Sequence, residues 1–222
     1  MTPVEAVKRY SYMAFGLFIM GLGVALCVNA DLGTSPITTL AYTMHHIVPS
    51  LSLGTFVFLQ NLVFFLLTVL FLGKNFRPRH LLQIPCSLFY GVVIDFWEWL
   101  IRDWLPTVYW LQFLFLLGGI LAMGLGFSLV FTSGVPLEAN TAFLSAVTQR
   151  TGASYGKLKI GNDVVIVLLA MALSLIFLHR VVGVREGTVI AAVLIGLVAG
   201  FFNRRLKNAE RFFKPEHKMP TP

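Results

Sequence analysis

The sequence reads Gly16-Leu17-Phe18-Ile19-Met20-Gly21-Leu22-Gly23-Val24-Ala25-Leu26 in its first apolar segment and Gly119-Ile120-Leu121-Ala122-Met123-Gly124-Leu125-Gly126-Phe127-Ser128-Leu129 further along the chain. At a constant offset of 103, position 119 against position 16, the three glycines, the methionine and two leucines coincide. Many membrane transporters are built from a duplicated unit. This internal repeat is therefore the most informative feature for function.

Other pairs extend the repeat over most of the chain. The same offset pairs Thr38 with Thr141, an offset of 102 pairs Gly54 with Gly156 and Gln60-Asn61 with Asn162-Asp163, and an offset of 105 pairs Gly91 with Gly196. We therefore predict a single membrane domain over residues 1–222. It consists of two copies of one unit, about 10–102 and 113–207, followed by a cytoplasmic tail over 208–222.

The composition excludes a soluble protein. Of the 222 residues, 57% are hydrophobic and 12% are charged, which is too little charge for the surface of a soluble domain. A net charge of +7 in a soluble protein would suggest nucleic acid, but basic residues also mark the cytoplasmic ends of membrane helices. We expect the lipid bilayer, and no nucleic acid, as a partner.

The apolar segments predict an all-α membrane protein with six transmembrane helices of about the 20 residues that cross a bilayer core. They cover about Tyr10–Val28, Thr55–Leu72, Leu81–Ile101, Val108–Phe131, Leu158–Leu178 and Thr188–Phe202. With the N-terminus in the cytoplasm, every lysine and arginine falls on the cytoplasmic side except Arg102, Arg180 and Arg185. This distribution obeys the positive-inside rule and places both termini in the cytoplasm.

A shorter helix is predicted in each unit after its first span. The first covers about Ser35–Val48, roughly 21 Å of helix, which is too short for a bilayer core of about 30 Å. Each short helix therefore either re-enters the membrane or lies on its surface as an amphipathic helix. Because three spans per unit is an odd number, the second unit is inverted relative to the first.

Small polar residues gather at the starts of the two short helices. Thr34 or Ser35 suits an N-cap, and Pro36 suits the first helical position. A re-entrant helix start leaves backbone N–H groups unpaired, with a partial positive charge that attracts anions. We expect these starts to bind the substrate through Thr34, Ser35, Thr38, Glu138, Asn140 and Thr141, although Glu138 also suits a helix cap.

Polar residues inside the spans are the next candidates, because charges in a membrane are costly and tend to mark transport pathways. The repeat pairs Asp163 with Asn61 and Asn162 with Gln60. We expect these four side chains to line one cavity between the units, with Asp163 binding a coupling proton or cation. The alternative is that Asp163 lies near its helix start and accepts backbone hydrogen bonds there.

Glycine spacing predicts close contacts between helices. The glycines of the repeated segment, Gly16, Gly21, Gly23 and their partners, allow helices to approach, and Gly196 and Gly200 form a GxxxG contact. No catalytic, phosphate-binding or cofactor motif is found. His45 and His46 are adjacent, so they do not face one another as metal ligands would. Asp95 and Glu98 are poor candidates for an acid–base pair, and we expect no enzyme, cofactor or metal.

Two stretches resemble a known family. Gly21-Leu22-Gly23-Val24-Ala25-Leu26 is followed by Ala30-Asp31-Leu32-Gly33-Thr34-Ser35-Pro36, and Gly187-Thr188 precedes an apolar run with Gly196. This pattern resembles the YczE/YyaS/YitT-like bacterial membrane proteins over most of residues 10–205. The resemblance implies a multi-pass protein of the bacterial cytoplasmic (inner) membrane and implies no substrate or catalytic residue.

The sequence favours a transporter of a small polar or anionic solute, bound between the inverted units at the short-helix starts. The alternative is a non-transporting membrane scaffold or an accessory protein of another complex. Both functions are compatible with self-association into a homo-oligomer.

Overall fold

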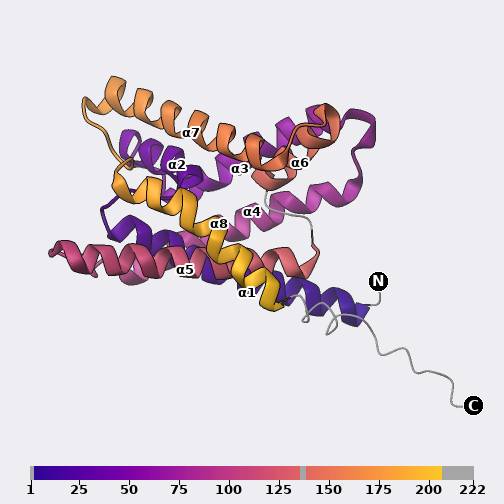
Figure 1. Ribbon diagram of the computed structural model, residues 1–222, viewed down its shortest axis with the longest axis horizontal. Coiled ribbons are helices and arrows are strands. Elements are labelled where there is room, and N and C mark those ends of the chain that lie inside the picture. The colour runs from indigo at the N-terminus through magenta and orange to yellow at the C-terminus, as the bar shows by residue number, and fades with distance from the viewer. Residues whose placement is uncertain (1–2, 136–138, 207–222) are drawn as a thin grey trace, which may run out of the picture.

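The computed structural model describes residues 3–135 and 139–206, which form eight α-helices and two short 3-10 helices (Figure 1). The predicted binding residue Glu138 and the tail over 208–222 lie outside the described residues. The α-helices are α1 (Pro3–Asn29), α2 (Pro36–Ile47), α3 (Leu53–Leu72), α4 (Gln83–Ile101), α5 (Tyr109–Ser133), α6 (Ala139–Thr151), α7 (Tyr155–Leu178) and α8 (Glu186–Leu206). The 3-10 helices are η1 (Gly73–Asn75) and η2 (Pro78–Leu82).

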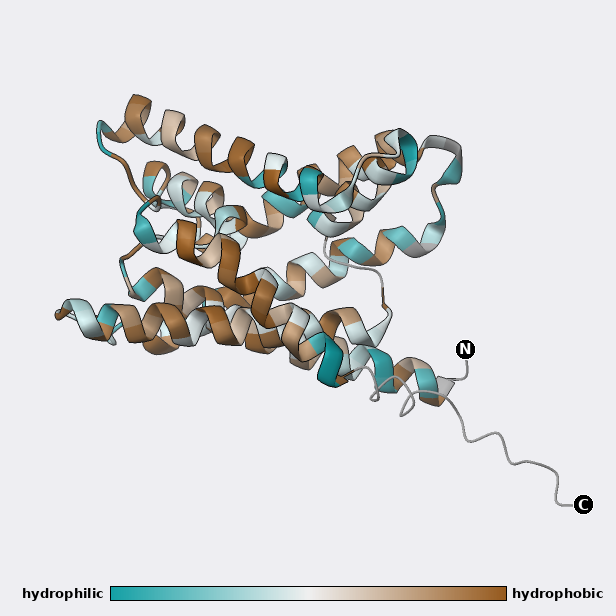
Figure 2. Cartoon of the chain, viewed as in Figure 1, coloured by the Kyte–Doolittle hydropathy of each residue, from teal (hydrophilic) through white to brown (hydrophobic). Residues whose placement is uncertain are grey.

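Six of these helices, α1, α3, α4, α5, α7 and α8, are long and apolar enough to cross a membrane. They coincide with the six predicted spans, and Figure 2 shows hydrophobic residues along most of their length. Helix α1 begins well before the predicted Tyr10, because Glu5 and Arg9 pair at 3.0 Å on successive turns and extend the helix beyond its apolar part. The chain is a multi-pass membrane protein.

Helices α1 and α5 cross in antiparallel directions and are held close by glycines. A Cβ atom at Gly16 would lie 2.9 Å from the carbonyl oxygen of Gly126, and one at Gly23 would lie 2.7 Å from that of Gly119. Cβ atoms in proteins essentially never approach other atoms so closely, so this packing requires glycine. The prediction that these glycines allow helices to approach closely is confirmed, and the helices that they bring together are the two repeated segments.

The remaining spans flank this central pair. Helix α4 packs on α1 and α8 packs on α5, with Gly21 against Val93 and Gly124 against Val198. Helix α3 packs along α4. Helix α7 packs instead on α2 and, within the described residues, is not packed along α8. Figure 1 shows α7 on the far side of α2 from the α1–α5 pair.

The short helices pack against long helices from the opposite half of the chain, α2 on α7 and α6 on α3. Ser35 is the N-cap residue of α2 and Pro36 its first helical residue, as predicted. The Ser35 hydroxyl hydrogen-bonds Thr38 Oγ1 at 2.8 Å and does not cap the backbone. The face of α2 that carries Thr38, Thr39 and Thr43 is buried, with exposed fractions of 6% or less.

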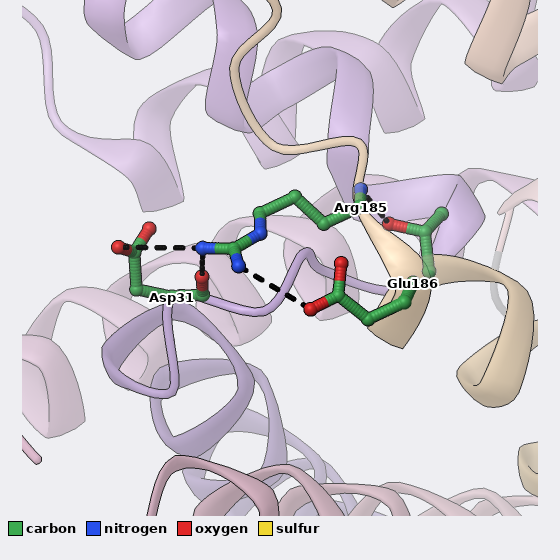
Figure 3. Close-up of polar contacts among 4 residues, drawn as sticks. Asp31, Arg185 and Glu186 are labelled. Atoms are coloured by element: carbon green, nitrogen blue, oxygen red, sulfur yellow. Dashed lines mark hydrogen bonds and ion pairs between the residues drawn. The ribbon is translucent and has the colours of Figure 1, made fainter. Parts of the chain in front are cut away.

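The loop after α1 is tied to the loop before α8 (Figure 3). Arg185 Nη1 donates a hydrogen bond to the carbonyl oxygen of Asp31 at 2.5 Å and lies 3.8 Å from its carboxylate, while Nη2 donates to Glu186 at 3.3 Å. The backbone N–H of Thr34 donates to the carbonyl oxygen of Gly183 at 3.1 Å. These bonds fix the start of α2 relative to α8.

Candidate functional site

A single cavity joins the starts of both short helices to α7 and α8. Its volume is about 100 Å³, measured as the space open to the centres of water-sized molecules. Ser35, Pro36 and Ile37 line it from α2, and Asn140 and Thr141 line it from α6. All the described α-helices except α3 contribute to its wall. The cavity therefore lies between segments from both halves of the chain.

An ion pair stands on the α7 side of the cavity. Lys159 Nζ donates to Asp163 Oδ2 at 2.7 Å, and the Asp163 side chain is 13% exposed. Asp163 lies two turns into α7, so it is beyond the free backbone N–H groups of the helix start. Its Oδ1 is buried without a hydrogen-bond partner in the described part of the chain. These contacts do not match the alternative in which Asp163 caps its helix.

Of the other polar residues predicted to line the cavity, Asn162 and Gln60 bind residues of its wall. Asn162 Nδ2 donates to Asn140 Oδ1 at 3.1 Å, and so holds a residue of the cavity wall. Gln60 Nε2 similarly donates to the carbonyl oxygen of Ile37 at 2.7 Å. Asn61 is buried on α3 and is not part of the wall. Of the four side chains expected to share one cavity, Asp163 lines it directly.

Thr34 and Thr38, two of the predicted binding residues, lie at the start of α2 and make their side-chain contacts there. Thr34 Oγ1 lies 3.2 Å from Thr39 Oγ1, and Thr39 Oγ1 donates to the carbonyl oxygen of Ser35 at 2.9 Å. Thr34 and Thr38 are buried, and neither lines the cavity. They are placed to hold the N-terminal turn of α2, from which Ser35 reaches the cavity wall.

The rest of the wall is mostly apolar. Met20, Met123, Phe127 and Ile195 form one part, and small residues of α8 form another. A cavity with an ion pair, an amide and a hydroxyl on one side and apolar side chains on the other suits a small solute that carries both charged or polar groups and an apolar portion.

Sequence reasoning missed two features of this site. Lys159 was assigned to the cytoplasmic surface, although its spacing of four from Asp163 on a helix was a usable signal. The predicted GxxxG contact of Gly196 and Gly200 is wrong within the described residues, since nothing lies within 4 Å of a Cβ atom at either glycine. Gly196 lines the cavity instead, because α7 stands away from α8.

The histidine pair has ordinary structural contacts. His45 Nδ1 lies 2.7 Å from the carbonyl oxygen of Leu51, and His46 Nδ1 lies 3.0 Å from that of Tyr42. Since a carbonyl oxygen only accepts, both ring nitrogens are donors in these bonds. The described residues contain no group of three or more histidines, cysteines or carboxylates placed to hold a metal ion.

Comparison with known proteins gives a family and one curated relative. Residues 7–204 match the profile described as "Family of unknown function (DUF6198)". The chain is 24% identical over 147 residues to the uncharacterized protein YyaS of Bacillus subtilis (strain 168), in an alignment that covers 64% of this chain and 71% of YyaS. This similarity confirms the resemblance seen in the sequence. No solved structure is significantly similar to the chain.

Proposed function

Because this chain belongs to the DUF6198 family of unknown function, its activity has to be derived from its own site, and we propose that it is a membrane transporter. The transported substance is a small polar or anionic solute. It binds in the cavity between the starts of α2 and α6, and it crosses the membrane by alternating access.

One observation carries this proposal: Ser35, Asn140 and the Lys159–Asp163 pair converge on one cavity inside a membrane protein. Polar and charged side chains are expensive within a bilayer and are found where they line a pathway or a binding site. Helices α2, α6 and α7 supply these groups from both halves of the chain. A site between two halves that move relative to one another is the arrangement that alternating access requires.

Helix contacts support two inverted units. At the α1–α5 crossing, Gly16 meets Gly126 and Gly23 meets Gly119. Adding the repeat offset of 103 turns Gly16 into Gly119 and Gly23 into Gly126, so each contact maps onto the other. The repeat likewise turns the packing of α4 on α1 into that of α8 on α5. It turns the packing of α2 on α7 into that of α6 on α3. A two-fold axis through the α1–α5 crossing accounts for all of these pairs.

Burial favours re-entrant short helices over helices on the membrane surface. A surface helix turns its polar face toward water. In α2 the threonine face is buried against the protein, and the helix start lines a cavity. Irregular backbone at membrane depth is tolerated where protein or a water-filled cavity covers it. The start of α2 satisfies this condition through its bonds to the α7–α8 loop.

The solute class follows from the groups on the wall. Lys159 and the backbone N–H groups of the helix starts attract a negative group, whereas the amide of Asn140 and the hydroxyl of Ser35 bind polar groups of either kind. Asp163 is the acceptor for a coupling proton or cation, because its Oδ1 has no partner among the described residues. This chemistry is binding and coupling, and no enzymatic step is proposed.

The proposed location is the cytoplasmic (inner) membrane of a bacterium, with both termini in the cytoplasm. The exposed side chains of Trp99, Trp104 and Trp110 then form an aromatic belt at the outer surface. Tyr155, at the start of α7, then lies at the cytoplasmic end of the cavity wall.

A ligand screen followed by uptake tests the proposal. The purified full chain is heated in the presence of pooled small organic anions and zwitterions, since a ligand at 100 times its Kd stabilises a fold by about 2.7 kcal/mol. A true ligand is expected to raise the melting temperature of the natural protein and not that of Asn140→Ala. The matched control is Asn75→Ala, an exposed amide outside this cavity, which should keep the full shift.

The identified solute is then offered to vesicles that contain the protein. Saturable uptake that Asn140→Ala reduces supports transport. Binding without uptake would favour the scaffold or accessory function, and an absence of any stabilising solute would leave no reason to prefer transport.

A further inference from the structure

Helices α3 and α4 are closed against each other by a glycine contact and a hydrogen-bonded carboxylate. A Cβ atom at Gly91 would lie 2.6 Å from the carbonyl oxygen of Gly54, and one at Gly54 would clash with the carbonyl oxygen of Gly91. Asp95, one turn further along α4, accepts hydrogen bonds from Ser52 Oγ at 2.6 Å and from the Gly54 N–H at 2.7 Å. The carboxylate thereby caps the start of α3 and fastens it to α4.

The repeat pairs Gly54 with Gly156 and Gly91 with Gly196, and these two partner glycines do not contact each other. Gly156 is the second residue of α7, as Gly54 is of α3, and Gly196 takes the place of Gly91. A Cβ atom at Gly156 would have only the Ser154 hydroxyl within 4 Å, and one at Gly196 would have nothing, among the described residues. Gly196 faces the cavity. Helices α3 and α4 are therefore packed together, whereas the equivalent helices of the second half, α7 and α8, stand apart.

The glycine contact at the start of α3 and the gap at the start of α7 lie at opposite ends of the bundle. The end of α3 lies beside the end of α6, where the Arg150 guanidinium is 5.7 Å from the ring centroid of Phe71, and α7 starts directly after α6. The end of α7 lies beside the end of α2, where Thr43 Oγ1 donates to the carbonyl oxygen of Val182 at 3.4 Å, and α3 starts after α2. The starts of α3 and α7 thus lie at opposite ends (Figure 1).

We infer that the α3–α4 contact is the outer gate of the transporter and that α7 and α8 form its cytoplasmic gate, which is open in this structure. The inference rests on the proposed transport function and the inverted repeat. Alternating access requires one gate to be closed while the other is open. Both units carry glycines at the same positions, so each adopts the closed packing in turn: Gly156 meets Gly196 as Gly54 leaves Gly91.

The burial of the helices agrees with this assignment. In the most apolar window of α3 and of α4, 33% of the residues are buried, against 17% in α7 and 22% in α8. Closing α7 on α8 gains van der Waals packing between the helices and narrows the cavity that both of them line. Opening α3 from α4 costs the two hydrogen bonds to Asp95, which offsets that gain. Two states of similar free energy are what a ligand needs in order to shift the population.

Cysteine cross-linking tests the gate assignment. The repeat pairs Ser154 with Ser52 and Gly200 with Asp95, and the side chains of Ser52 and Asp95 touch in the closed gate. In the full chain with both natural cysteines replaced by alanine, Ser154→Cys/Gly200→Cys is expected to be joined by a short bifunctional thiol reagent when the cytoplasmic gate closes.

Two further substitutions shift the equilibrium in opposite directions. Asp95→Asn weakens the outer gate without adding bulk. It should raise the 154–200 cross-linking rate about tenfold, equivalent to about 1.4 kcal/mol, which is close to the contribution of a hydrogen bond to a charged group. Gly196→Leu should abolish this cross-link, because the side chain blocks closure. A Cβ atom at position 196 meets nothing within 4 Å in the described residues and the position lines the cavity, so the variant is expected to keep the fold.

A 154–200 pair that does not react in the parent protein or in the Asp95→Asn variant overturns the inference. A cross-link that joins two copies of the chain, or one that persists in Gly196→Leu, overturns it as well. None of these results affects the solute-binding assay. Conversely, the protein could cross-link as expected and yet neither bind nor move a solute. That result would contradict the transport function but support the two alternating helix contacts.

Discussion

Lys159 Nζ lies 2.7 Å from Asp163 Oδ2, one turn apart on α7, and Asp163 faces a cavity that also receives the starts of α2 and α6. The pair brings a positive and a negative group to a wall that is otherwise mostly apolar. The Asp163 side chain is 13% exposed and loses hydration there, whereas Lys159 stays 45% exposed. A poorly hydrated carboxylate in a membrane protein is found most readily where a ligand or an ion uses it.

Asp163→Asn is expected to uncouple solute uptake from a proton or cation gradient, because an amide keeps nearly the shape of the carboxylate but carries no charge. Uptake by vesicles that contain the natural protein or the variant is measured with and without the gradient. Asp103→Asn is the control, since the Asp103 side chain is 88% exposed. Uptake by Asp163→Asn that still depends on the gradient would remove the coupling role of this residue.

Gly126→Ala is expected to destabilise the protein by about 1–3 kcal/mol, the usual cost of overpacking. The new Cβ atom would lie 2.6 Å from the carbonyl oxygen of Gly16, which belongs to the backbone and cannot rotate away. Gly161→Ala on α7 is the matched control, because nothing lies within 4 Å of a Cβ atom there in the described residues. Thermal unfolding in detergent measures both, and equal melting temperatures would show that the α1–α5 contact is looser than described.

Asp31→Ala is expected to lower stability by about 1 kcal/mol, whereas Asp31→Gly should leave it unchanged or raise it. Asp31 has φ +50°, a left-handed conformation that costs an alanine about 1–2 kcal/mol and a glycine little. Its carboxylate is 77% exposed and 3.8 Å from Arg185, so that ion pair contributes less than about 1 kcal/mol. If glycine and alanine destabilise equally in thermal unfolding, the carboxylate matters more than the backbone.

Cysteines at Ser50 and Thr151 are expected to react from opposite sides of the membrane. Both residues are exposed, Ser50 in the turn after α2 and Thr151 at the end of α6. A membrane-impermeant thiol reagent should label Ser50→Cys in intact cells and Thr151→Cys after the membrane is opened. Labelling of both from one side would contradict the inverted arrangement of the units.

Most of the fold was predictable because its signals are local. The length and hydropathy of each span, the Pro36 start of α2 and the glycines of the α1–α5 crossing are readable from neighbouring residues, and the structure has all of them. The GxxxG prediction at Gly196 and Gly200 failed because a pattern of small residues indicates only that another helix can pack closely there. The pattern does not indicate which helix packs there, or in which conformational state.

The site was only partly predictable, for the same physical reason. The repeat drew attention to Asp163 and Asn61 equally, yet Asp163 lines the cavity beside Lys159 and Asn61 is buried elsewhere on α3. The sequence alone determined the membrane class, the six spans and the recurrence of the glycine-rich segment, since these depend on composition and on periodicity along the chain. Only the tertiary structure decided that Gly54 touches Gly91 while Gly156 stands clear of Gly196, because two nearly equivalent helix pairs differ in packing and not in pattern.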